Sequence, residues 1–133
     1  MANNRELSQF ANVVGYNGGN IGIGTDNPGN LNGNADDLVV GTGAGNRGIT
    51  VFSGTSNQGN LYFADGTSGS SPLRGGITYN HDDNSLKFLT NAVERLRITS
   101  GGRVGLGTDN PGSVLDIQRA AAGSEQMLSL IHI

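Results

Sequence analysis

The stretch "NGGNIGIGTDNPG" occupies residues 17–29, and residues 100–112 repeat it as "SGGRVGLGTDNPG". Nine of the thirteen positions are identical, and two of the four differences exchange one apolar residue for another. In both copies apolar residues alternate with glycine, which is the period of a β-strand. Asn-Pro-Gly closes each copy, and a strand ends before a proline because proline cannot donate to the ladder. The repeat therefore predicts the same strand and turn twice.

Between the two copies, short segments of branched and aromatic residues alternate with turn residues, as expected for strands. These segments are residues 37–41, 48–54, 60–65, 76–80, 85–90 and 95–100. Residues 80–84 supply the turn of a hairpin, and residues 90–95 make a second tight connection. In the last segment, strict alternation predicts that Leu96 and Ile98 face inward and that the arginines beside them face outward. After the second copy, residues 113–118 are again strand-like.

The predicted fold class is all-β, with short antiparallel strands and hairpins in a repeated module. The connections leave no room for crossover helices. One short helix is predicted near the start, over residues 4–14, because Leu7, Phe10, Ala11 and Val14 fall at helical spacing. Val13 and Val14 could equally begin a strand.

Composition shows how hard it is for one copy of this chain to build a core. The chain has 133 residues, of which 23 are glycine and 16 are asparagine, and only 35% are apolar. The apolar surface that such a chain can bury is too small to offset the conformational entropy that is lost on folding. We expect either partial disorder or a core that is shared with neighbouring copies.

Charge and cysteine content exclude several classes of function. The net charge is −3 and 14% of residues are charged, so the basic surface that nucleic-acid binding requires is missing. There is no cysteine, hence no disulfide framework and no thiolate metal site. No apolar run approaches the length that crosses a membrane, and the opening residues lack the apolar core of a signal peptide.

The repeat also predicts how the chain is organised. Residues 1–20 form an N-terminal attachment segment, residues 21–103 a β-rich module, and residues 104–127 the start of a second, truncated module. We interpret glycines 22, 24, 105 and 107 as a bare strand face that lets several chains approach one axis at the module junctions. Valine at Gly105 and Gly107 would then disrupt assembly.

The last six residues, "LSLIHI" (128–133), have a different origin in our interpretation. The codons CTG TCT CTT ATA CAC ATC would encode them, and this string resembles the mosaic-end adapter of transposon-based sequencing libraries. We interpret them as a cloning or assembly scar, so that the natural protein would continue past Met127. The alternative is a genuine apolar β-tail.

Two patterns suggest ligand sites, and both are better explained as turns. "GAGNRG" (43–48) fits the dinucleotide-binding pattern, but that pattern needs a following helix, and "ITVFSG" follows instead. His81, Asp82 and Asp83 are metal-ligand types, yet three adjacent residues in a hairpin turn rarely converge on one ion. Asp26-Asn27 and Asp109-Asn110 lack the alternating acids of a calcium loop. We therefore predict no cofactor-binding and no metal-binding residues.

Catalytic residues are not predicted either, and we expect no enzyme. The serines lack a histidine partner at a plausible position. Asp65 with Asp82 or Asp83 could form a carboxylate pair for glycoside hydrolysis, but nothing in the sequence places them at the required separation. Arg95, Arg97 and Arg103 form a basic stripe whose default interpretation is a solvated strand face. In an oligomer they could pair with an aspartate or with Glu94 of the next chain.

Over residues 4–118 the sequence resembles the tail-fibre proteins of marine tailed phages, particularly those of cyanobacteria. The resemblance rests on the "NxGIGTxxP" motif followed by "LDI", on "YNHDDNSLKFLTNAVERLRITSGGRVGLGT" (79–108) and on the opening "NRELSQFANVV" (4–14). It implies an elongated homotrimer of β-rich fibre modules in the virion, joined at its N-terminal end to the baseplate or other tail proteins. Contact with a host receptor would be indirect, because receptor binding in fibres is usually distal. Many relatives end in a self-cleaving chaperone domain, which nothing here matches, and no third copy of the repeat is present.

A second function class stays open at this point, namely a carbohydrate- or receptor-binding adhesin module. An outward-facing Tyr62 or Tyr79 would favour it, because sugar faces pack on aromatic rings.

Overall fold

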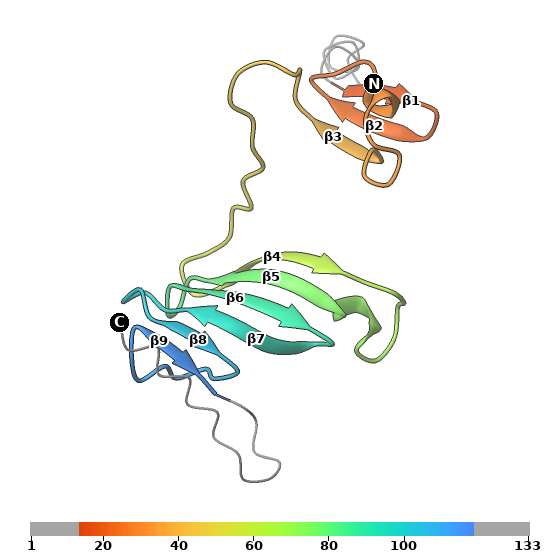
Figure 1. Ribbon diagram of the computed structural model, residues 1–133. Helices are drawn as coiled ribbons and strands as arrows, with labels where there is room; N and C mark the ends of the chain where they lie inside the picture. Colours follow the sequence, from red (N-terminus) through yellow and green to blue (C-terminus); the bar gives the residue numbers. More distant parts are fainter. Residues whose placement is uncertain (1–13, 119–133) are drawn as a thin grey trace, which may run out of the picture. The chain divides into compact units, whose positions relative to one another are not determined.

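The computed structural model describes residues 14–118 and divides between Thr50 and Val51 into two compact units (Figure 1). Within these residues the elements are nine strands and two 3₁₀ turns, and there is no α-helix. This confirms the predicted class: two sheets, mostly antiparallel. Among the same residues, no helix has the length and apolar character needed to cross a membrane.

The N-terminal unit holds a three-stranded sheet in the order β1-β2-β3. Strands β1 (Val14–Asn17) and β2 (Asn20–Ile23) are antiparallel, and Gly18 and Gly19 connect them with φ angles of 64° and 101°. Glycine suits this two-residue turn because both positions need positive φ. β3 (Leu38–Val40) then pairs parallel to β2. Val14 begins β1, whereas the rest of the predicted helix over residues 4–14 lies outside the described residues.

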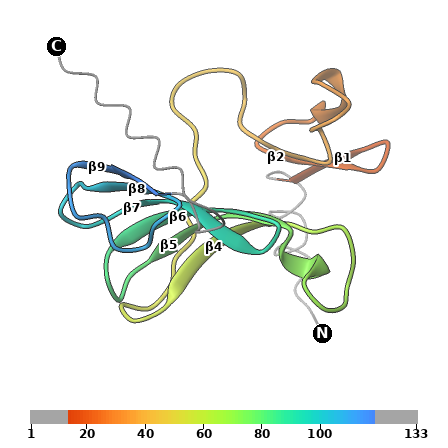
Figure 2. The same cartoon turned by 60° about the horizontal axis from the view of Figure 1, so that its bottom comes forward.

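The C-terminal unit holds one six-stranded sheet whose strand order follows the chain (Figure 2). Its strands are β4 (Gln58–Phe63), β5 (Gly75–Asn80), β6 (Ser85–Thr90), β7 (Val93–Ile98), β8 (Val104–Leu106) and β9 (Leu115–Ile117). Neighbours are antiparallel as far as β8, and β9 pairs parallel to β8. The 3₁₀ turns are η1 (Pro28–Asn30) in the N-terminal unit and η2 (Ser71–Leu73) between β4 and β5.

Both predicted hairpins are confirmed. The β5–β6 turn lies between the paired residues Asn80 and Ser85, and Asn84 closes it with a φ of 52°. Asn91 and Ala92 connect β6 to β7 with φ angles of 52° and 60°. Asparagine tolerates this left-handed conformation better than most residues do, which explains its place at both turns.

The strand predicted over residues 48–54 does not form. Its apolar side chains point into solvent: Phe52 is 97% exposed and Ile49 is 74% exposed. Strand propensity reflects packing on a half-buried pleated surface, and residues 48–54 pair with no strand of either sheet. The segment instead leads to β4, where Val51 lies close to Gly59.

The two copies of the sequence repeat form the same structure. In each, the repeat strand pairs antiparallel with the strand before it and parallel with the strand after it. The amide of Ile21 donates to the carbonyl of Asp37 at 2.8 Å, and that of Val104 donates to Val114, also at 2.8 Å. The connection inside the parallel pair runs over residues 24–37 in the first copy and only 107–114 in the second.

The glycines of the repeat have a different role from the one predicted. A Cβ atom at Gly105 would lie 2.5 Å from the carbonyl oxygen of Thr108, and one at Gly22 would collide with the carbonyl of Thr25. The close neighbour is therefore the turn of the same chain, not a strand of another chain. Gly24 and Gly107 have φ angles of 81° and 74°, the left-handed region that favours glycine.

One row of apolar residues crosses the whole six-stranded sheet. Register pairs join them from β4 to β9 in the order Leu61, Ile77, Phe88, Leu96, Leu106, Ile117. Paired residues share a face, and a second row on that face is Gly59, Tyr79, Leu86, Ile98, Val104, Leu115. We call these two rows the apolar face. Among residues 14–118, no apolar side chain apart from Pro28 and Pro111 is buried. Within the C-terminal unit, no second layer covers the apolar face, although Val51 and Ser53 lie beside it at Gly59.

The prediction that Leu96 and Ile98 face inward therefore needs correction. Both lie on the apolar face, but Leu96 is only half-buried and Ile98 is 36% exposed. The regular alternation also breaks, because a bulge between Phe88 and Leu89 leaves Arg95 without a register partner. This shift places Glu94 on the opposite face beside Arg97.

Candidate functional site

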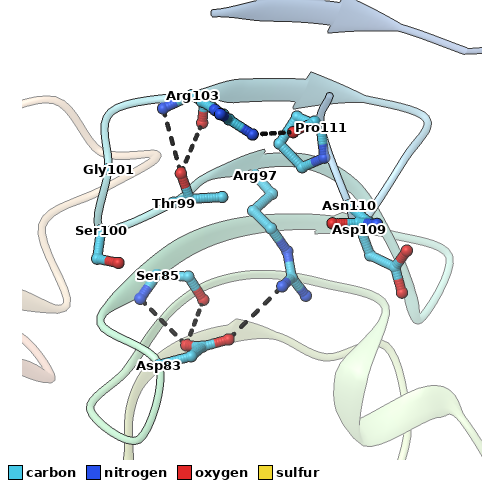
Figure 3. A pocket seen from close by; sticks show the side chains of 10 residues that line it. All are labelled: Asp83, Ser85, Arg97, Thr99, Ser100, Gly101, Arg103, Asp109, Asn110 and Pro111. Atoms are coloured by element: carbon cyan, nitrogen blue, oxygen red, sulfur yellow. Dashed lines mark hydrogen bonds and ion pairs between the residues drawn. The ribbon is translucent and has the colours of Figure 1, made fainter. Parts of the chain in front are cut away.

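The strongest candidate site is an open polar cavity of about 530 Å³ on the face opposite the apolar one (Figure 3). Three segments that are distant in sequence contribute to it: the β5–β6 hairpin, the end of β7 with the turn after it, and the second copy of the repeat. Its lining residues are Asp83, Ser85, Arg97, Thr99, Ser100, Gly101, Arg103, Asp109, Asn110 and Pro111.

The hairpin side of the cavity is fixed by hydrogen bonds. Ser85 is 1% exposed, and its amide and Oγ both donate to Oδ1 of Asp83, at 3.1 and 2.7 Å. The amide of Asp82 donates to Oδ1 of Asn80 at 3.3 Å. These are Asx-type turns, so the prediction that residues 81–83 form a turn is confirmed. The ring of His81 packs edge-on against Tyr79, at a centroid distance of 4.9 Å.

Arg97 occupies the middle of the cavity. Its Nε and Nη2 donate to the two carboxylate oxygens of Glu94 at 2.7 and 2.8 Å, and its Nη1 lies 3.5 Å from Oδ2 of Asp83. The register partner on β8 is Gly105, which contributes no side chain. Such a two-pronged pair holds the guanidinium in one orientation.

The third side of the cavity is built by the repeat. Thr99 Oγ1 accepts a hydrogen bond from the amide of Arg103 at 3.1 Å, and Arg103 Nη1 donates to the carbonyl of Pro111 at 3.2 Å. Asn110 donates from its amide to Thr108 Oγ1 at 3.2 Å. The first copy makes the equivalent bond, from Asn27 to Thr25, at 3.3 Å. Asp26-Asn27 and Asp109-Asn110 are therefore turn residues, as predicted, and threonine supplies the turn acceptor.

The electrostatics of the cavity are balanced, with two arginines and two aspartates in its lining. The hydrogen bond from Ser85 lowers the pKa of Asp83 below its ordinary value, and the charges of Lys87 and Arg97 act in the same direction against burial. The hydrogen bond to Glu94 raises the pKa of Arg97, with the charges of Asp83 and Asp109 contributing. Asp83 is thus held as an anion, which does not suit a general acid.

The lowered pKa of Asp83 predicts that its contribution to stability depends on pH. A carboxyl whose pKa is lowered by folding stabilises the protein above its unfolded pKa of about 3.9, and the contribution disappears as pH falls through the folded pKa. Asp83→Asn should therefore lower the Tm at pH 7, and the difference should shrink as the pH falls below about 3.9 towards the lowered folded pKa.

Thermal unfolding from pH 7 to pH 2.5 measures this difference. Asp82→Asn is the control, because it removes the same charge next door without breaking a side-chain hydrogen bond found in residues 14–118. Equal Tm losses for the two variants at pH 7 would contradict the prediction.

The remaining sequence candidates lie apart from this cavity. Asp65 pairs with Arg74 at 3.1 Å near the start of β5, whereas Asp83 follows the end of that strand. Six strand residues separate the two carboxylates by roughly 20 Å, too far for glycoside hydrolysis. Within residues 14–118, no three histidine or carboxylate side chains gather closely enough to hold a metal ion.

The first half of the "GAGNRG" segment, residues 43–45, bends the chain, with positive φ at Gly43 and Gly45. No helix follows it, and Arg47 folds back to donate to Thr42 Oγ1 at 2.6 Å. A phosphate would therefore meet no helix N-terminus at this bend.

The predicted basic stripe of arginines does not form. Arg95 donates to Thr90 Oγ1 at 3.3 Å, whereas Arg97 pairs with Glu94 of its own chain and Arg103 bonds the backbone of the repeat. Sequence reasoning missed the cavity because no single motif contains it. The signal that could have indicated it is the opposite charges of Glu94 and Arg97, three residues apart. The bulge places both side chains on the same face of the sheet.

Comparison with known proteins adds no family assignment. No family model matches the sequence, and no curated protein matches it at a significant level.

Proposed function

We propose that this chain is a structural component of a phage tail fibre, part of the shaft and virion attachment, with no enzymatic activity. It would assemble as a homotrimer, join other tail proteins through its N-terminal end, and serve host attachment indirectly. The sequence resemblance over residues 4–118 supports this role. The single observation that carries it is the six-stranded sheet whose apolar face is covered by no second layer of the C-terminal unit itself.

Two further features of the chain agree with a fibre role. A domain normally needs two packed layers around a core, and a single sheet becomes stable when a neighbour supplies the second layer. The same three-stranded motif also occurs in both units, once at β1–β3 and once at β7–β9. Repetition of units that cannot bury their own core is typical of stacked or oligomeric assemblies.

An adhesin that binds a carbohydrate is the second candidate, and the polar cavity favours it. Fixed donors from Arg97 and Arg103 and acceptors from Asp83 and Asp109 suit a hydroxylated ligand. The predicted aromatic platform is weaker support, because Tyr62 pairs with Gly76 on the cavity side whereas Tyr79 lies on the apolar face. Binding on a glycan array that is lost in Arg97→Met would favour the adhesin over the shaft.

The solution mass tests the proposed function. Light scattering after size exclusion should give three times the 13.7 kDa of one chain. Sedimentation velocity should show an elongated particle, and circular dichroism should show that it is rich in β-structure. A compact monomer that unfolds cooperatively would contradict the proposal, since the chain would then close its core alone.

A further inference from the structure

The apolar face of the six-stranded sheet is unusual in its continuity. Its central row runs without interruption across all six strands, and no charged residue occurs in either row. Leu61 is 56% exposed at one edge, Ile117 is 66% exposed at the other, and Phe88 near the middle is still 37% exposed. An exposed apolar surface of this extent marks an interaction site.

On the opposite face of the same sheet, polar side chains form hydrogen bonds with one another, and a turn of the same chain packs on the strands. Thr78, 4% exposed, donates to Oδ1 of Asn60 at 2.9 Å, and Glu94 accepts both hydrogen bonds of Arg97. The turn of the repeat, from Thr108 to Pro111, lies over Gly105. The two faces of one sheet therefore differ sharply, although Val51 and Ser53 of the C-terminal unit lie beside the apolar face at Gly59.

We infer that the apolar face is the surface through which copies of this chain associate, each copy packing this face against the same face of its neighbours. The inference rests on the proposed function and deepens it by naming the contact surface. A surface without charges suits a copy of itself, because identical faces then meet with no like-charge repulsion. The N-terminal unit repeats the pattern, since Tyr16, Ile21 and Leu38 form an uncharged register row on its sheet.

The size of the face agrees with this occupant. The sheet has four strands of six residues and two strands of three residues. With strands about 4.8 Å apart and a rise of about 3.3 Å per residue, its projected area is roughly 500 Å². Because side chains project from the sheet, its solvent-accessible area is larger than this projected area. It approaches the roughly 800 Å² that each partner contributes to a standard interface.

Thiol labelling tests the inference directly, because the 133-residue chain contains no cysteine. Leu106→Cys places a thiol on the apolar face, and Tyr62→Cys places one on the opposite face. The two positions are matched controls, since in a single chain the native residues are 42% and 43% exposed. The full chain is labelled with a maleimide, and the mass of each variant is measured in the same buffer.

If the apolar face is the contact surface, the thiol at residue 106 should react at least about tenfold more slowly than the one at residue 62, because labelling then requires local opening. Urea should remove the difference. Loss of the trimer in Leu106→Cys, with the trimer kept in Tyr62→Cys, would support the same conclusion.

Other outcomes overturn the inference in distinguishable ways. A trimer in which both thiols react equally fast would place the interface elsewhere, and the proposed function would stand. A single-chain mass with a protected thiol at residue 106 would mean that the chain covers its own sheet. A single-chain mass for both variants and for the unsubstituted chain, with equal labelling rates, would contradict both the inference and the proposed function.

Discussion

Gly105→Ala is expected to lower the free energy of unfolding of the C-terminal unit by about 1–3 kcal/mol, the range typical of overpacked sites. The new Cβ would lie 2.5 Å from the carbonyl oxygen of Thr108 and 3.2 Å from its Cγ2 atom. A backbone oxygen cannot rotate away as a side chain can. The turn from Thr108 to Pro111 would have to move, and Pro111 is buried.

Urea unfolding of the full chain, followed by circular dichroism, measures the loss. Gly101→Ala is the matched control, because its Cβ would meet nothing nearer than Thr99 Oγ1 at 3.9 Å. We expect that control to stay within about 0.5 kcal/mol of the natural sequence. Equal losses in the two variants would show that Gly105 is conserved between the copies for a reason other than the approach of the turn.

Arg97→Met should have the second largest effect, a loss of about 1–2 kcal/mol from a charged hydrogen-bonded pair that keeps some solvent contact. The side chains of Arg97 and Glu94 are 16% and 24% exposed. Removing the guanidinium leaves Glu94 with Lys87 as its nearest cation, at 3.9 Å. Arg97→Lys should recover only part of the loss, because an ammonium cannot make both bonds at once.

The double-mutant cycle with Glu94→Gln isolates the pair energy. Arg95→Met serves as the control on the same strand, since Arg95 is exposed and makes one hydrogen bond of 3.3 Å. A coupling energy near zero would mean that Arg97 stabilises the sheet through packing of its stem alone.

The hairpins could be predicted from sequence because their determinants are local. Asn84 and Asn91 occupy positive-φ turn positions, and the branched residues around them fall at period two. The strand over residues 48–54 was predicted wrongly, since propensity cannot show whether a partner strand exists. The parallel pairing of β8 with β9 also depends on a neighbour that the local pattern does not name.

The candidate cavity lay beyond prediction for two physical reasons. A bulge in β7, opposite the Phe88–Leu89 step, changes the face of the sheet on which Glu94 lies. A one-residue shift in register moves the side chains beyond it to the other face. The cavity also joins Asp83, Arg97 and Asp109, which are brought together only by the pairing of several strands. The repeated glycines were recognised, but their reason was not, because the turn that folds over them is visible only in three dimensions.

The order of the six-stranded sheet has a consequence for the rate at which it forms. Each strand from β4 to β9 pairs with its neighbour along the chain, so every loop that must close is short. Pairing between near neighbours gives a low contact order, which favours fast folding for a β-structure. The sheet can therefore grow strand by strand as the chain emerges during synthesis, at a rate independent of concentration. A step that brings chains together depends on concentration, and the two phases should separate when refolding is followed at different dilutions.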